Sequence, residues 1–89
     1  MNEISILDIL DHYSRKAAEA DDMLLEIGNA IKGSISAITS LWSGAAANVC
    51  ALHLERLAEE VTKVQSSLSD AQFFLSSMKK ECMEKDTLI

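Results

Sequence analysis

Two long segments of this chain, one on each side of its midpoint, carry a repeating pattern of apolar or small residues. In both segments these residues follow one another at alternating steps of three and four, which average 3.5 residues. That spacing keeps one stripe of a helix facing a neighbouring helix when the two supercoil around each other. The first stripe comprises Ile6, Leu10, Tyr13, Ala17, Ala20, Leu24, Ile27, Ile31, Ser34, Ile38 and Leu41. The second comprises Ala47, Cys50, Leu54, Leu57, Val61, Val64, Leu68, Ala71, Leu75, Met78 and Cys82.

The two stripes predict an all-α fold, an antiparallel two-helix hairpin. The chain contains no proline, so nothing forces a break within either helix. We expect a single domain over residues 1–89, with a first helix over about residues 4–41, a turn at 42–44, a second helix over about residues 45–84 and a short C-terminal tail. Ser5 or Asn2 can cap the first helix. Leu57 is expected to be buried where the stripes meet.

The turn motif is Trp42-Ser43-Gly44, which contains the only tryptophan. Gly44 is expected to adopt a backbone angle that a Cβ atom would penalise. Trp42 has two interpretations: it clamps the turn against the start of the second helix, or it offers an exposed surface for recognition. Gly28 and Gly33 interrupt the first helix, either as tolerated surface glycines or to let a neighbouring helix approach closely.

Several large apolar residues fall outside the two stripes. They are either scattered exposed residues, which are normal on protein surfaces, or the contact between two hairpins in a four-helix bundle. Leu7 and Leu25 are expected to point away from the first stripe, and Leu52 and Phe73 away from the second. The interface expected for a bundle comprises Leu7, Leu25, Val49, Leu52, Phe73 and Phe74.

Composition narrows the classes of partner. The net charge is −6, and an acidic protein repels both phosphate backbones and anionic lipid. We therefore expect no nucleic-acid partner. No apolar run approaches the roughly twenty residues that span a bilayer. The stretch Met1–Leu10 lacks the basic residues, the continuous apolar segment and the cleavage site of a signal peptide.

The residues that carry chemistry form no recognisable catalytic or metal site, so we expect no enzyme activity, cofactor or metal. Cys50 and Cys82 would lie about 48 Å apart on one continuous helix, too far for a disulfide within the chain. Both fall on the second stripe, where a thiol behaves as a small apolar residue. A bridge between subunits is the alternative. Cys50 and His53 share a helix face, but no second ligand pair accompanies them.

A chain of 89 residues with two amphipathic helices and Leu41-Trp42-Ser43-Gly44 between them resembles the WXG (ESAT-like) family, small proteins exported by bacterial type VII secretion systems. The resemblance covers essentially the whole chain. It implies antiparallel homodimers or heterodimers that form four-helix bundles. It also implies a bacterial cytoplasmic protein that is then secreted, or displayed on the cell surface, without a cleaved signal peptide.

One feature of the family is missing. Members that carry their own export signal have an aromatic residue followed four positions later by an acidic one near the end of the second helix, whereas here Ser77 follows Phe73 and Met78 follows Phe74. The resemblance therefore implies a partner or targeting factor that relies on another protein's signal, such as a related small protein or the helical domain of an LXG-type toxin. The alternative is a cytosolic helical adaptor or chaperone unrelated to type VII secretion.

Overall fold

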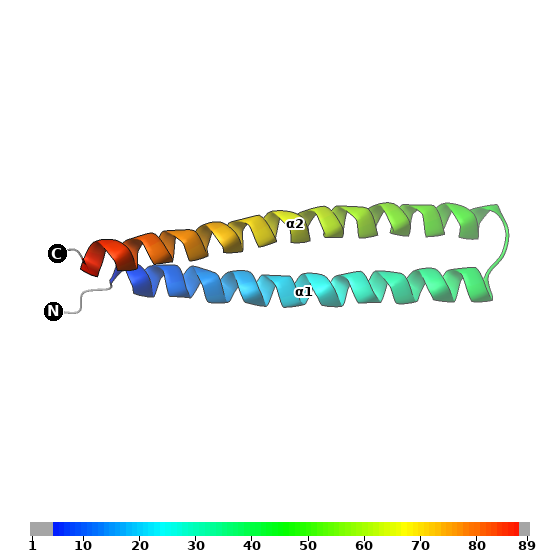
Figure 1. Cartoon of the computed structure of the whole chain (residues 1–89). Helices are drawn as coiled ribbons and strands as arrows, with labels where there is room; N and C mark the ends of the chain where they lie inside the picture. The colour runs from blue at the N-terminus through cyan, green and yellow to red at the C-terminus, as the bar shows by residue number, and fades with distance from the viewer. Residues whose placement is uncertain (1–4, 88–89) are drawn as a thin grey trace.

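The chain folds as a helical hairpin. The computed structural model describes residues 5–87, which form two helices, α1 (Ile6–Leu41) and α2 (Ala45–Thr87), lying side by side and running in opposite directions (Figure 1). The molecule is a narrow rod of 68 × 23 × 14 Å. The expected all-α hairpin is therefore confirmed.

Local hydrogen bonds define both ends of α1. The Ser5 hydroxyl accepts a hydrogen bond from the Asp8 backbone N–H at 3.1 Å, so Ser5 is the N-cap and the helix starts at Ile6. The residue expected to begin the helix, Ile4, lies outside the described residues. At the other end Trp42 has an extended backbone, and its N–H donates to the Ile38 carbonyl at 3.0 Å. Helix α2 continues to Thr87, three residues beyond the expected end.

Residues 42–44 connect the helices. Gly44 has a φ of +99°, a backbone angle that residues with a Cβ atom rarely adopt. The expected backbone angle at Gly44 is therefore confirmed. Its carbonyl accepts a hydrogen bond from the Asn48 N–H at 3.1 Å, so Gly44 opens α2 as well as closing the turn.

The contact between the helices forms a regular seam, defined here as the regularly spaced buried and half-buried positions at the centre of the contact; Asp11, Ala20 and Met78 are also half-buried but flank it. The seam positions repeat at alternating steps of three and four in both helices, as expected of a coiled coil. In α1 they are Leu7, Leu10, Ser14, Ala17, Asp21, Leu24, Gly28, Ile31, Ile35 and Ile38. In α2 they are Ala47, Ala51, Leu54, Ala58, Val61, Gln65, Leu68, Gln72, Leu75, Lys79 and Cys82.

The sequence pattern identified only half of this seam. Leu10 is 5% exposed and Leu54 is half-buried, as expected, but Ile6, Tyr13 and Leu57 are exposed. In both helices the alternate seam position lies one residue later than expected. The prediction was wrong because it selected the most apolar stripe of each helix. At the alternate seam positions the hairpin contact instead contains smaller or more polar residues, such as Ser14, Gly28 and Gln65.

Gly28 lies in the seam and Gly33 on the exposed surface of α1. A Cβ atom added at either position would meet nothing within 4 Å, apart from the helix's own nearby backbone. Within the hairpin, neither glycine is therefore needed for a close approach of the helices.

Candidate functional site

A continuous row of apolar and small residues lies beside the seam along the whole length of α1. Its members also repeat at steps of three and four, but all except the half-buried Ala20 are exposed. Lys16 is the only charged residue in the row, and Ser34 is the only other polar one. The row comprises Ile6, Ile9, Tyr13, Lys16, Ala20, Met23, Ile27, Ala30, Ser34, Ala37 and Leu41.

Helix α2 carries a narrower row, whose members recur every seven residues; the positions between them include the polar or charged His53, Glu60, Ser67 and Glu81. Each of its members directly precedes a seam residue, as Ile6, Tyr13 and Ile27 do in α1. The α2 row comprises Cys50, Leu57, Val64, Ala71 and Met78, with Ala46 and Phe74 along its outer edge. Leu57 is 49% exposed, and Met78 is half-buried.

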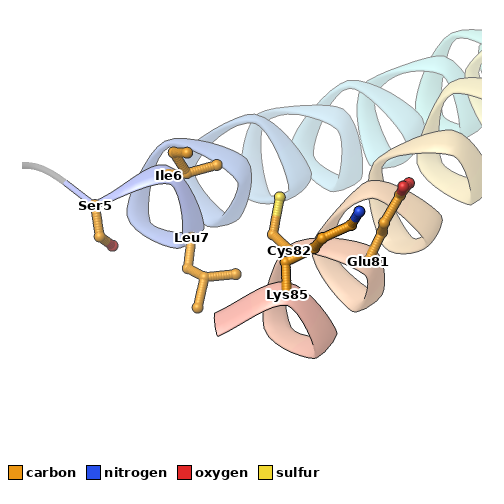
Figure 2. A pocket seen from close by; sticks show the side chains of 6 residues that line it. All are labelled: Ser5, Ile6, Leu7, Glu81, Cys82 and Lys85. Atoms are coloured by element: carbon orange, nitrogen blue, oxygen red, sulfur yellow. The ribbon is translucent and has the colours of Figure 1, made fainter. Parts of the chain in front are cut away.

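The two rows lie on the same side of the hairpin. When two helices run antiparallel, the residues that precede the corresponding seam positions in each helix face the same direction. Two hollows, one at each end of the rod, agree with this geometry, because each is lined by residues of both helices on this side. At the open end, Ile6 and Leu7 of α1 line a hollow with Cys82 and Lys85 of α2 (Figure 2). Together the rows form one surface, which we name the apolar face.

The second hollow lies beside the turn. Ile38 and Trp42 line it from the α1 side, and Ala46, Ala47 and Cys50 from α2. The Trp42 side chain is 69% exposed, so it covers only part of this hollow. That exposure leaves most of the indole surface accessible for a contact with another molecule.

The opposite side of the hairpin differs in character. Its positions directly follow a seam residue and are mostly polar, with Leu25, Leu52, Phe73 and Met83 as the large apolar residues. The other members of this opposite face are Asp8, Asp11, Arg15, Ala18, Asp22, Asn29, Lys32, Ser36, Thr39, Asn48, Glu55, Glu59, Thr62, Ser66, Ser69, Ser76 and Lys80. The rod is therefore amphipathic across its width, with one apolar and one polar side.

The residues expected to form the interface lie on different surfaces of the hairpin. Leu7 is half-buried in the seam rather than pointing away from it, so that expectation was wrong. Leu25, Leu52 and Phe73 lie on the opposite face, whereas Phe74 borders the apolar face. The remaining residue, Val49, is exposed on the outer surface of α2. Sequence reasoning missed the apolar face because half of its residues, such as Ile6, Ile27 and Leu57, had been assigned to the hairpin contact.

Charge is unevenly distributed along the rod. All 14 acidic residues lie outside the stretch 27–54, in which Lys32 is the only Lys or Arg. The half of the hairpin beside the turn is therefore almost uncharged. In the other half, Lys79 of the seam donates a hydrogen bond to Asp11 on α1 and forms an ion pair with it. Since both side chains are substantially exposed, this pair contributes about 0–1 kcal/mol.

A second ion pair lies at the edge of the apolar face. Lys63 donates a hydrogen bond to Glu60 at 3.0 Å, and this bond, with the negative charge of Glu60, raises the pKa of Lys63. Both groups are exposed and belong to one helix, so the pair supports α2 rather than a binding site.

Cys50 is exposed and Cys82 half-buried, and both are free thiols. Cys50 was expected in the seam and instead belongs to the apolar face. Within the described residues, no three His, Cys, Asp or Glu side chains converge as a metal site would require. No helix in the described part of the chain is long and apolar enough to cross a membrane.

Comparisons with protein-family models, with curated proteins and with solved structures find no match to this chain.

Proposed function

We propose that this protein is a non-enzymatic helical subunit that binds another helical protein through the apolar face. The observation that carries this proposal is the second heptad-spaced row of apolar residues, exposed along the hairpin. In a four-helix bundle each helix contacts two neighbours, so it needs one stripe for the helix of its own chain and another for a partner. The seam and the apolar face supply these two stripes.

The exposed area supports the same proposal. The chain exposes 7117 Å², whereas a compact monomer of 9.7 kDa exposes about 5,100 Å². The difference exceeds the roughly 800 Å² that each partner buries in a standard protein–protein interface. This chain therefore exposes enough surface, beyond that of a compact monomer of the same mass, for a partner to cover.

Within this class, a WXG-like role in type VII secretion is the more specific proposal. The hairpin shape and the Trp42-Ser43-Gly44 connection support it, and the exposed Trp42 is available for recognition by a partner or by secretion machinery. Because Phe73 and Phe74 lack an acidic residue four positions later, the export signal would come from the partner. That partner is a related small helical protein or the helical domain of a secreted toxin, for which this chain acts as chaperone or targeting factor.

Affinity purification of the tagged protein from its native cells tests the proposal. Ile27→Glu and Leu57→Glu place a charge on the apolar face and should reduce the co-purifying helical protein at least tenfold, because burying an unpaired charge is costly. Leu25→Glu and Leu52→Glu are matched controls, since these leucines are similarly exposed but lie elsewhere, and they should retain it.

Equal capture by all four variants would contradict the assignment of the apolar face. The culture supernatant separates the two roles. Export of the complex, lost when the partner is deleted, supports the type VII role, whereas a complex that stays inside the cell supports a cytosolic adaptor.

A further inference from the structure

The apolar face is wider on α1 than on α2, and we propose that it binds a single amphipathic helix of another protein, with basic residues along both flanks of that helix. This inference rests on the proposed function, because it names the chemistry of the partner on the same face. The partner contributes one helix to the contact, so the assembly along the rod contains three helices.

Two kinds of position make up this side of each helix. Successive residues of a coiled coil are about 103° apart around the helix axis. Residues that directly precede a seam residue therefore lie alternately about 75° and about 130° from the centre of the seam. We name them near and far positions. The near positions are apolar or small in both helices, as Ile27 and Leu57 illustrate.

The far positions differ between the helices. In α1 they are Ile9, Lys16, Met23, Ala30 and Ala37, of which only Lys16 is polar. In α2 they are Ala46, His53, Glu60, Ser67, Phe74 and Glu81, most of which are polar or charged. The apolar surface therefore continues to the far positions on α1, whereas on α2 it largely ends at the near positions.

This difference in width favours a single helix. In a square bundle of four helices, each neighbour lies about 90° around a helix from the next and covers near and far positions alike. A second hairpin set squarely on this face would bury Glu60 and Ser67 against apolar side chains, which is costly. A third helix in the groove between α1 and α2 lies at about 60° instead, where it covers mainly the near positions. Displaced toward α1, it also covers the far positions of α1 and leaves those of α2 in water.

The groove extends along the whole rod. The face follows α1 over its 36 residues, or about 54 Å, so it fits a partner helix of similar length. A hollow lies in the groove at each end, one lined by Ile6 and Cys82 (Figure 2), the other by Ile38 and Cys50. Between these ends, Met23, Ile27 and Leu57 are 62%, 44% and 49% exposed, so each retains apolar area for a partner to bury.

The margins of the face determine the charge of the partner. On α2 the margin consists of the far positions. On α1 it consists of the outermost residues, His12, Glu19, Glu26, Gly33 and Ser40. All charged residues of the two margins are acidic, namely Glu19, Glu26, Glu60 and Glu81. Lysine or arginine on both flanks of the partner helix would lie beside these carboxylates, as flanking charges do in coiled coils.

Two of these carboxylates already have a cation of the same helix beside them. Lys16 pairs with Glu19 at 3.4 Å and Lys63 with Glu60 at 3.0 Å. Within the described residues, no cation pairs with Glu26 or Glu81. The strongest demand for a basic residue in the partner is therefore beside Glu26 on one flank and Glu81 on the other.

A designed peptide tests the inference. The probe has five heptads, with leucine at both core positions and lysine at both flanking positions, and its control has glutamate in place of lysine. Like charges on the flanks keep each peptide from pairing with itself. At physiological salt, fluorescence anisotropy should show one lysine peptide bound per chain, with a dissociation constant at least tenfold lower than that of the glutamate peptide.

Charge variants of the protein locate the peptide. Ile27→Glu and Leu57→Glu should each weaken binding of the lysine peptide at least tenfold, whereas Leu25→Glu and Leu52→Glu on the opposite face should not weaken it. All four variants add the same negative charge, so a general attraction between a basic peptide and an acidic protein affects them alike. Circular dichroism checks that each variant is folded.

Thiol labelling distinguishes one bound helix from two. In a chain that carries Cys50→Ala and Cys82→Ala, the replacements Ala30→Cys and Ser67→Cys each introduce one thiol at an exposed far position, on α1 and on α2 respectively. The bound lysine peptide should slow the reaction of maleimide at position 30 at least tenfold. The rate at position 67 should change by less than twofold.

Equal protection of both thiols, or two peptides bound per chain, would overturn the single helix. Equal affinity for the two peptides would overturn the basic flanks, and a dimer by light scattering without peptide would show that a second copy occupies the face instead. If neither peptide binds, but Ile27→Glu and Leu57→Glu still abolish capture of a helical protein from native cells, the proposed function stands and this inference alone is wrong.

Discussion

At the residue scale, Gly44 is the position where an added side chain would strain the turn between the helices. Its φ of +99° costs an L residue about 1–3 kcal/mol, so Gly44→Ala should destabilise the protein by that amount. Gly33→Ala is the matched control, because it lies in an exposed helix with open space at its Cβ and should stabilise by about 1 kcal/mol. Thermal unfolding followed by circular dichroism measures both. An unchanged melting temperature for Gly44→Ala would contradict the turn geometry.

At the element scale, a leucine in the seam and a leucine on the apolar face should contribute differently to the stability of the hairpin. Leu10 is 5% exposed, so Leu10→Ala should cost about 2–5 kcal/mol in the free energy of unfolding. Leu57 is half exposed in the hairpin, so in a monomeric chain Leu57→Ala should lower the free energy of unfolding by clearly less than Leu10→Ala does. The loss caused by Leu57→Ala should increase once a partner is bound. Denaturant unfolding with and without the partner measures the difference. Equal losses for the two variants in the monomer would place Leu57 in the seam after all.

The sequence predicted much of this element structure, and the remainder has a physical cause. The absence of proline, the heptad spacing, Ser5 and Gly44 are local signals, and they located the helices, the N-cap and the turn to within a few residues. Periodicity reports every apolar position of a helix, whichever neighbour covers it. Because Ile6, Tyr13 and Leu57 continue the same alternation as Leu10 and Leu54, the pattern could not show which residues face the second helix of the chain. Only the positions that are buried between α1 and α2 in the folded hairpin show which residues these are.

At the scale of the whole molecule, the central claim is that the apolar face is covered in the native assembly. Two methionines test it within one chain. Met23 lies on the apolar face and is 62% exposed in the hairpin, whereas Met83 lies on the opposite face and is 51% exposed. In an isolated hairpin they should therefore react with dilute peroxide at similar rates.

The most direct measurement is the oxidation rate of each methionine in the assembly isolated from native cells, followed by peptide mass spectrometry. Burial of the apolar face should slow Met23 at least tenfold relative to Met83, and Ile27→Glu should remove that protection by releasing the partner. Oxidation of Met23 as fast as Met83 in the native assembly would contradict the account, because the apolar face would then be open to solvent.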